Sequence, residues 1–222
     1  MIPIWLDVTG RHVIIVGLGP VGQRRALQFQ RAGALVTGVD PLPRIQGQEW
    51  GELIRNGLEL QCQPYHISIF EELSLIGIKP QMALACANPT VNKQVVADCR
   101  QLKIWASTST FSENDPADFQ LGAVARGESM AVCVHSDRSS PGLSSSVRDE
   151  IAETLLPAAD RLAKLASFWR PRILNEIADD SEKKRLLDLF SNRAILKSEV
   201  QNPGTGEKMI QSELDCAREL FP

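Results

Sequence analysis

The stretch VIIVGLGPVG at residues 13–22 decides the fold of this chain. Its first four residues are apolar and β-branched, which is typical of a strand buried on both faces of a parallel sheet. Apolar residues at helical spacing follow over 21–32, Gly33 stands where a helix commonly ends, and 34–39 form a second apolar run. Strand, glycine turn, helix and strand within about 30 residues indicate the first βαβ unit of a Rossmann-type α/β domain.

The glycine turn has the spacing of a dinucleotide-binding site. Gly17, Gly19 and Gly22 form a G-x-G-x-x-G motif, and it lies in the required context between a predicted strand and a predicted helix. Gly17 permits the tight turn, Gly19 lets a pyrophosphate approach the backbone, and Gly22 lets helix and strand pack closely. Pro20 and Val21 begin the helix, whose free N–H groups and dipole attract phosphate.

Asp40 stands at the end of the second strand, 18 residues after Gly22. An acidic side chain there accepts hydrogen bonds from the ribose hydroxyls of adenosine and would repel the 2′-phosphate of NADP. The sequence therefore predicts NAD as the cofactor, and Arg44, four residues further on, would relax that preference. The alternative is that the glycines only shape a turn and that Asp40 only caps a strand end.

Strands and helices continue to alternate, which predicts a mainly parallel sheet with right-handed crossovers. We expect strands at 58–63, 82–87 and 104–108 and helices at 49–56, 70–76 and 92–102. A polar loop at 110–118 ends this pattern. The rest of the chain predicts a hairpin and then helices: strands 121–124 and 130–135, and helices 143–156, 158–178, 182–196 and 206–220. Pro171 should kink or break the second of these helices.

Composition and charge describe an ordinary globular protein. The 222 residues are 43% hydrophobic and 23% charged, with a formal net charge of −3. A mildly acidic chain is not expected to bind nucleic acid, and no apolar run has the length of a membrane span. The N-terminus lacks the pattern of a secretory signal, so we expect a cytoplasmic protein.

The histidines and cysteines give no sign of a metal site. The three histidines are scattered and no cysteines form a Cys-x-x-Cys pair, so no built-in transition-metal cage is expected. The number of cysteines is odd, and three lie within apolar runs, which indicates reduced and buried thiols. The five are Cys62, Cys86, Cys99, Cys133 and Cys216.

Several segments, taken in order, resemble the precorrin-2 dehydrogenase family, which also forms the N-terminal module of siroheme synthases. They are an arm and first strand at 3–16, the glycine turn with the basic pair Arg24-Arg25, the turn ACAN at 85–88 with Val91-Asn92, the strand MAVCVH and turn SSP within 130–141, and the segments RDEI and LLP within 148–157. The likeness covers about residues 1–200 and adds Ala87 and Asn88 to the predicted cofactor contacts. The basic pair either reaches phosphates or substrate carboxylates or is an exposed part of the helix.

The resemblance implies a fold, an assembly and a reaction. The fold would have three parts: an NAD-binding Rossmann domain at 1–112, a small β dimerisation element at 113–142 and a helical C-terminal domain at 143–222. The assembly would be a homodimer. The reaction would be NAD-dependent oxidation of the tetrapyrrole precorrin-2 to sirohydrochlorin, and some family members also insert ferrous iron.

Asn114 stands where the family has an aspartate two positions before a proline. Loss of a hydride from the macrocycle is accompanied by loss of a proton, which a carboxylate accepts and an asparagine does not. We therefore assign the catalytic base to the adjacent Asp115, against the alternative that Asp115 is an Asx-turn residue before Pro116. If neither Asn114 nor Asp115 serves, the chain is a catalytically lapsed protein that binds NAD and a tetrapyrrole.

The serine-proline turn is the predicted substrate site. Precorrin-2 carries several carboxylates, and Arg138, Ser139, Ser140 and the start of the following helix would bind them. The alternative is simple capping of that helix by Ser140, and the two roles are compatible. His135 ends the preceding strand and is a candidate acid, base or iron ligand, against the alternative of a structural histidine.

Overall fold

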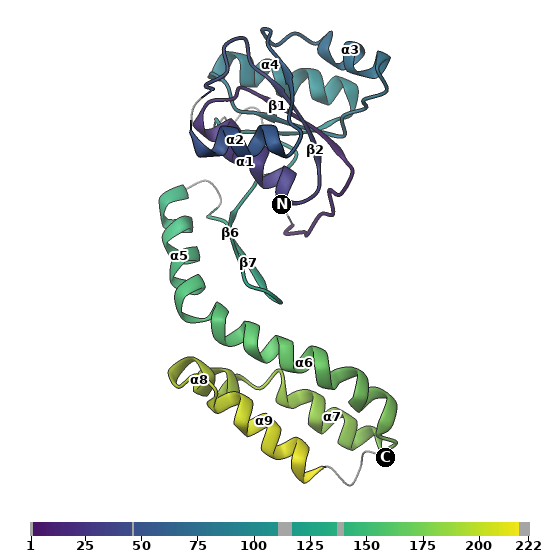
Figure 1. The fold of residues 1–222 in the computed structure, drawn as a ribbon, viewed down its shortest axis with the longest axis vertical. Helices are drawn as coiled ribbons and strands as arrows, with labels where there is room; N and C mark the ends of the chain where they lie inside the picture. The colour runs from purple at the N-terminus through teal and green to yellow at the C-terminus, as the bar shows by residue number, and fades with distance from the viewer. Residues whose placement is uncertain (1, 46, 111–116, 137–139, 218–222) are drawn as a thin grey trace. The chain divides into compact units, whose positions relative to one another are not determined.

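A parallel sheet with helices on its two faces forms the first of two units into which the chain divides (Figure 1). The computed structural model describes residues 2–45, 47–110, 117–136 and 140–217. Unit 1 is Met1–Gln120 and unit 2 is Leu121–Pro222. The Rossmann-type α/β fold predicted from the sequence is confirmed, whereas the three-part division with boundaries after 112 and 142 stays a prediction.

The sheet of unit 1 has the strand order β3-β2-β1-β4-β5, and all neighbouring strands are parallel. Its strands are β1 His12–Val16, β2 Leu35–Val39, β3 Glu59–Gln61, β4 Met82–Ala85 and β5 Trp105–Thr108. In the register, Val16 at the end of the central strand β1 pairs with Val39 of β2 on one side and Ala85 of β4 on the other. The turns that follow these three strands therefore meet at one edge of the sheet.

Helices cover both faces of this sheet, which explains why its strands are nearly continuous apolar runs. They are α1 Pro20–Arg31, α2 Gln48–Arg55, α3 Ile69–Leu75 and α4 Pro89–Leu102. Ile14 and Val16 share a buried core with Phe70 of α3 and Val95 of α4. Helix α1 packs against α2 as well as against β1 and β2.

Unit 2 consists of an antiparallel hairpin followed by helices. Its elements are β6 Ala123–Arg126, β7 Ala131–Val134, α5 Pro141–Thr154, α6 Leu156–Glu176, α7 Asp180–Leu189, α8 Arg193–Gln201 and α9 Thr205–Cys216. Asp160 of α6 accepts hydrogen bonds from the backbone N–H groups of Glu128, Ser129 and Met130 in the hairpin turn. These N–H groups, that of Ser129 first, lower the pKa of the Asp160 carboxyl, so the turn is held by a carboxylate.

The single helix predicted over 182–196 is wrong, because α7 ends at Leu189 and α8 begins at Arg193. Asn192 separates the two helices, and its Oδ1 accepts hydrogen bonds from the N–H groups of Ala194 (2.8 Å) and Ile195 (3.4 Å). This is N-capping, which makes Asn192 the start of a new helix. Pro171 lies inside α6 without ending it.

The cysteines are less buried than the sequence predicts. Cys99 is buried and Cys86 is partly buried, but the other three, Cys62, Cys133 and Cys216, are exposed; all five are free thiols. Cys133 lies within β7, one strand of a two-stranded hairpin, so its apolar neighbours in sequence did not indicate burial. None of the helices in the described ranges has the length and apolarity that crossing a membrane requires.

Candidate dinucleotide site

Gly17 directly follows β1 and has a backbone conformation that favours glycine. Its φ is +90°, and a Cβ at this position would lie 2.7 Å from the backbone nitrogen of Ala87. Its own N–H donates to the carbonyl of Val39 at 2.8 Å. The turn therefore joins the ends of β1, β2 and β4, and a side chain at Gly17 would force β1 and the β4–α4 turn apart.

Gly19 is the N-cap residue of helix α1, which has no side-chain cap and has Pro20 in its first turn. The first N–H groups of an α-helix have no acceptor within the helix, and here no side chain supplies one. A Cβ on Gly19 would meet nothing within 4 Å, whereas a Cβ on Gly22 would lie 1.8 Å from the carbonyl oxygen of Gly17. There is thus free space next to the backbone of Gly19, where a pyrophosphate could approach, whereas Gly22 is packed tightly against Gly17. Val21, in the same helical turn, is 38% exposed.

Asp40 follows β2 and holds the glycine turn by its carboxylate. Its Oδ2 accepts a hydrogen bond from the N–H of Leu18 at 2.6 Å, and its Oδ1 accepts one from the N–H of Leu42 at 2.8 Å. A carboxylate has about four acceptor positions, so Asp40 keeps capacity for the hydroxyls of a ribose. Gly38 of β2 leaves space for the side chain of Leu18, since a Cβ on Gly38 would lie 2.7 Å from it.

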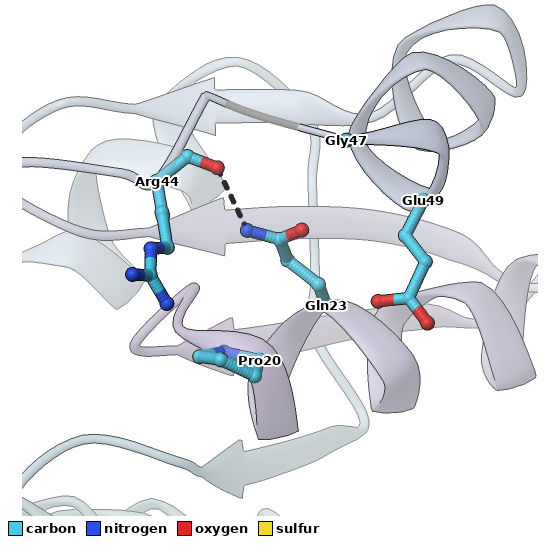
Figure 2. Close-up of a pocket in the computed structure, with 5 residues that line it drawn as sticks. All are labelled: Pro20, Gln23, Arg44, Gly47 and Glu49. Carbon is cyan, nitrogen blue, oxygen red and sulfur yellow. Dashed lines mark hydrogen bonds between the residues drawn. The ribbon is translucent and has the colours of Figure 1, made fainter.

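Gln23 of α1 is a site residue that the sequence reasoning missed. It is 4% exposed, and its Nε2 donates to the carbonyl of Leu18 at 2.8 Å and to that of Arg44 at 2.9 Å. Figure 2 shows the second bond, which fastens the β2–α2 loop to the glycine turn. Gln23 lies three residues before Ala26 and four before Leu27, which are both buried. A polar residue on the apolar face of a predicted helix was therefore the sequence signal that could have identified it.

A pocket of about 380 Å³ lies beside Gln23. Its walls come from the start of α1, the β2–α2 loop and the start of α2, and the residues that line it are Pro20, Gln23, Arg44, Gly47 and Glu49 (Figure 2). The side chains of Arg44 and Glu49 bring opposite charges to this pocket. The structure thus places Arg44, predicted to influence the choice of cofactor, next to the glycine turn.

The turn after β4 brings Ala87 and Asn88 to the same edge of the sheet. Asn88 caps α4, because its Oδ1 accepts a hydrogen bond from the N–H of Val91 at 3.0 Å. Asn92, one turn further and 1% exposed, holds both backbone groups of Ala87: its Oδ1 accepts from the N–H at 2.8 Å and its Nδ2 donates to the carbonyl at 3.1 Å. The same Nδ2 lies 3.4 Å from Oγ of Ser109 and 3.2 Å from Oγ1 of Thr110, beyond the end of β5.

Arg24 and Arg25 differ in their surroundings. Arg24 is exposed, while Arg25 is partly buried and donates to Oε1 of Gln28 at 2.9 Å. Burial lowers the pKa of Arg25, and burial raises the pKa of the nearby Cys86 thiol to about 11, so Cys86 is a neutral thiol.

The predicted base and most of the predicted substrate turn lie outside the described residues. These are Asn114, Asp115, Arg138 and Ser139. Asp118, which follows that loop, uses its carboxylate for the sheet: its Oδ2 accepts from the N–H of Ala106 at 2.8 Å.

In unit 2, Ser140 caps α5 by accepting a hydrogen bond from the N–H of Leu143 at 3.3 Å, and His135 follows β7 and is exposed. The capping predicted for Ser140 is therefore observed. Within the described ranges, no three His, Cys, Asp or Glu side chains gather in a way that would hold a metal ion.

Comparison with known proteins shows the family to which the chain belongs. A family model described as "Putative NAD(P)-binding" matches residues 4–123, more than half of the chain and nearly all of unit 1. A siroheme synthase of Acinetobacter baylyi is 25% identical over 222 residues, which are 99% of this chain and 44% of that protein. The chain thus spans less than half the length of the siroheme synthases it matches.

Two further relatives are similar over most of their own length. A protein of Methanocaldococcus jannaschii described as "Putative precorrin-2 dehydrogenase" is 24% identical, with 86% of this chain and 91% of that protein covered. Among solved structures, "SirC, precorrin-2 dehydrogenase" superposes with a TM-score of 0.66 at 20% identity and covers 96% of this chain. This structural likeness extends over both units and supports the fold predicted for them.

Proposed function

Because the chain belongs to the NAD(P)-binding family whose model matches residues 4–123, we propose that it is an NAD-dependent oxidoreductase that converts precorrin-2 to sirohydrochlorin. The substrate class is proposed from the relatives whose names are siroheme synthase and precorrin-2 dehydrogenase. The observation that carries the cofactor assignment is the uncapped start of α1 at Gly19, with the carboxylate of Asp40 fixed beside it.

Different residues of unit 1 bind different parts of the cofactor in this proposal. The N–H groups at the start of α1 bind the pyrophosphate, and the remaining acceptor positions of Asp40 bind the adenosine ribose. Ala87 and Asn88 are the proposed contacts from the neighbouring turn, Asn88 through its backbone because its side chain caps α4, and Asn92 holds this turn in place. The bound nicotinamide supplies the hydride acceptor, and the protein contributes placement and proton transfer.

Proton transfer is assigned to Asp115, next to Asn114, because oxidation of the macrocycle releases a proton together with the hydride. Arg138, Ser139, Ser140 and His135 are the proposed contacts for the substrate. Ser140 in particular lies at the start of α5, where the helix dipole favours a carboxylate.

The test is a turnover assay without metal. Purified chain, precorrin-2 and NAD⁺ are mixed, and the absorbance of NADH is followed together with the spectrum of sirohydrochlorin. We expect both signals to rise in parallel, and we expect Asp115→Ala to abolish both while Asn114→Ala retains turnover. If NAD⁺ and precorrin-2 bind but neither signal rises, the chain is a binding protein for NAD and tetrapyrroles. Addition of ferrous iron to the completed reaction tests the ferrochelatase activity, which we propose as a second step.

We also propose that the chain acts as a homodimer in the cytoplasm. Support for the dimer comes from unit 2, where the two-stranded hairpin β6–β7 packs against α5 and where Leu143 and Val147, one turn apart on α5, are 59% and 40% exposed. These exposed apolar side chains on the helix beside the hairpin are a candidate contact surface for a second copy of the chain. Light scattering during size exclusion should give twice the chain mass, and Leu143→Glu should shift it toward one chain. The free thiols suit a reducing compartment.

A further inference from the structure

The pocket beside Gln23 borders the adenosine side of the proposed cofactor site. Pro20, the first residue of α1, forms one wall next to the turn assigned to the pyrophosphate, and Arg44 forms another, four residues after the ribose-binding Asp40. Because Gln23 bonds both the glycine turn and the carbonyl of Arg44, the wall that carries Arg44 has a fixed position. With the ribose at Asp40 as proposed, Arg44 and Glu49 are the charged side chains of this pocket that could act on a group attached to that ribose.

Two charged side chains, those of Arg44 and Glu49, line the pocket, and a third, that of Asp40, contacts the glycine turn after β2. The carboxylate of Asp40 is committed to the N–H groups of Leu18 and Leu42, so its charge is compensated in part and it serves to build the turn. Arg44 would attract a phosphate. Glu49, in the first turn of α2, lines the pocket opposite it, and its carboxylate would repel one (Figure 2).

We infer that Glu49 is a specificity-determining residue of the cofactor site, which disfavours the 2′-phosphate of NADP and thereby cancels the attraction of Arg44. This inference rests on the proposed function, because it concerns the same cofactor. A substitution of Asp40 would also remove its hydrogen bonds to Leu18 and Leu42, whereas Glu49 is exposed.

The second acidic residue of α2 provides a matched control. Glu52 lies one turn after Glu49 on the same helix, but it does not line the pocket and forms an ion pair with Arg31 at 2.8 Å. Glu49 also acts on Arg31, since both glutamates raise the pKa of that guanidinium, with Glu52 contributing first. Glu52→Gln therefore makes the same change in net charge on the same helix, at a residue outside the pocket lining.

The experiment is calorimetric titration of the full chain with NAD⁺ and with NADP⁺ at low salt, for the wild type, Glu49→Gln, Glu52→Gln and Arg44→Gln. Removal of one charge next to a phosphate should tighten NADP⁺ binding by about tenfold in Glu49→Gln and leave NAD⁺ binding within about twofold. Glu52→Gln should leave the ratio of the two dissociation constants unchanged. Arg44→Gln should weaken NADP⁺ selectively. The gain in Glu49→Gln should shrink at high salt, because screening acts on exposed charges.

The outcomes separate this inference from the proposed function. An unchanged ratio in Glu49→Gln, or an equal shift in Glu52→Gln, overturns the role of Glu49 while NAD⁺ binding stands. Failure of the wild type to bind either dinucleotide overturns both proposals. Thermal unfolding of each variant without ligand verifies that all of them fold.

Discussion

Helices α1 and α4 start at similar places in the fold, but the start of α1 is uncapped and that of α4 is capped by a side chain. Each follows one of two adjacent parallel strands, β1 or β4, and each has a proline in its first turn. The start of α1 is Gly19, which has no side-chain cap, whereas the start of α4 is capped by Asn88 and braced by Asn92. The uncapped helix start is therefore available to a ligand, and the capped one supports the turn against which Gly17 packs.

Substitutions in the two turns should therefore affect different properties of the protein. Changes at the α4 turn should cost mainly folding free energy, and changes at Gly19 should cost mainly affinity for the dinucleotide. Variants in which the free energy of unfolding and the affinity for the dinucleotide are measured separately test this difference.

The largest effect is expected for Asn92→Leu. The substitution removes the partners of both the N–H and the carbonyl of Ala87 and the contacts to Ser109 and Thr110. Unpaired polar groups in a partly buried turn cost about 1–3 kcal/mol each, so we expect a loss of about 3–4 kcal/mol in the free energy of unfolding, measured by urea denaturation. A loss below about 1 kcal/mol would show that water replaces Asn92 and that the brace is dispensable.

Gly17→Ala should come next, with a loss of about 2–4 kcal/mol, because the new Cβ combines left-handed strain with overlap against the β4–α4 turn. Gly57→Ala is the matched control, since Gly57 has a similar φ of +80° and a Cβ there would meet no atom within 4 Å. It should lose only about 1 kcal/mol from the strain. Equal losses in the two variants would mean that the contact between Gly17 and Ala87 has no energetic importance.

Gly19→Ala tests the uncapped helix start directly. Its φ of −68° suits any residue and its Cβ would meet nothing, so the free energy of unfolding should change by less than about 0.5 kcal/mol. The methyl group would occupy the space through which a pyrophosphate approaches the backbone. We expect NAD⁺ binding, measured by calorimetry, to weaken by at least about tenfold, or about 1.4 kcal/mol. Unaltered affinity would place the cofactor elsewhere.

The contrast between the two turns also explains what the sequence predicts well. The glycine spacing, the proline and Asp40 are local signals of a helix start near a strand end, and the structure places them as predicted. The β/α alternation in unit 1 is likewise visible in the sequence, because buried parallel strands are short apolar runs.

The sequence pattern does not show hydrogen bonds between segments that are distant in the chain. The sequence shows Asn92 as the start of a helix and as part of a segment of the family resemblance, but not that it joins residues 87, 109 and 110. Gln23 likewise connects Leu18 with Arg44. Such bonds depend on which strand ends meet at the edge of the sheet, and the register determines this. The missed break at Asn192 is different, because its capping side chain was present in the sequence.

The smallest expected effect concerns Asn88, predicted from the sequence as a cofactor contact and observed as the cap of α4. Asn88→Ala removes the cap and should lower the free energy of unfolding by about 1 kcal/mol. Asn88→Asp keeps an acceptor for the N–H of Val91 and adds a charge that the helix dipole favours, so its stability should match the wild type. If Asn88 acts only as a cap, Asn88→Asp also binds NAD⁺ within about twofold of the wild type, since no phosphate lies near it. A tenfold loss of affinity with unchanged stability would instead put the side chain of Asn88 in the cofactor site, and α4 would then join α1 as a helix whose start faces the ligand.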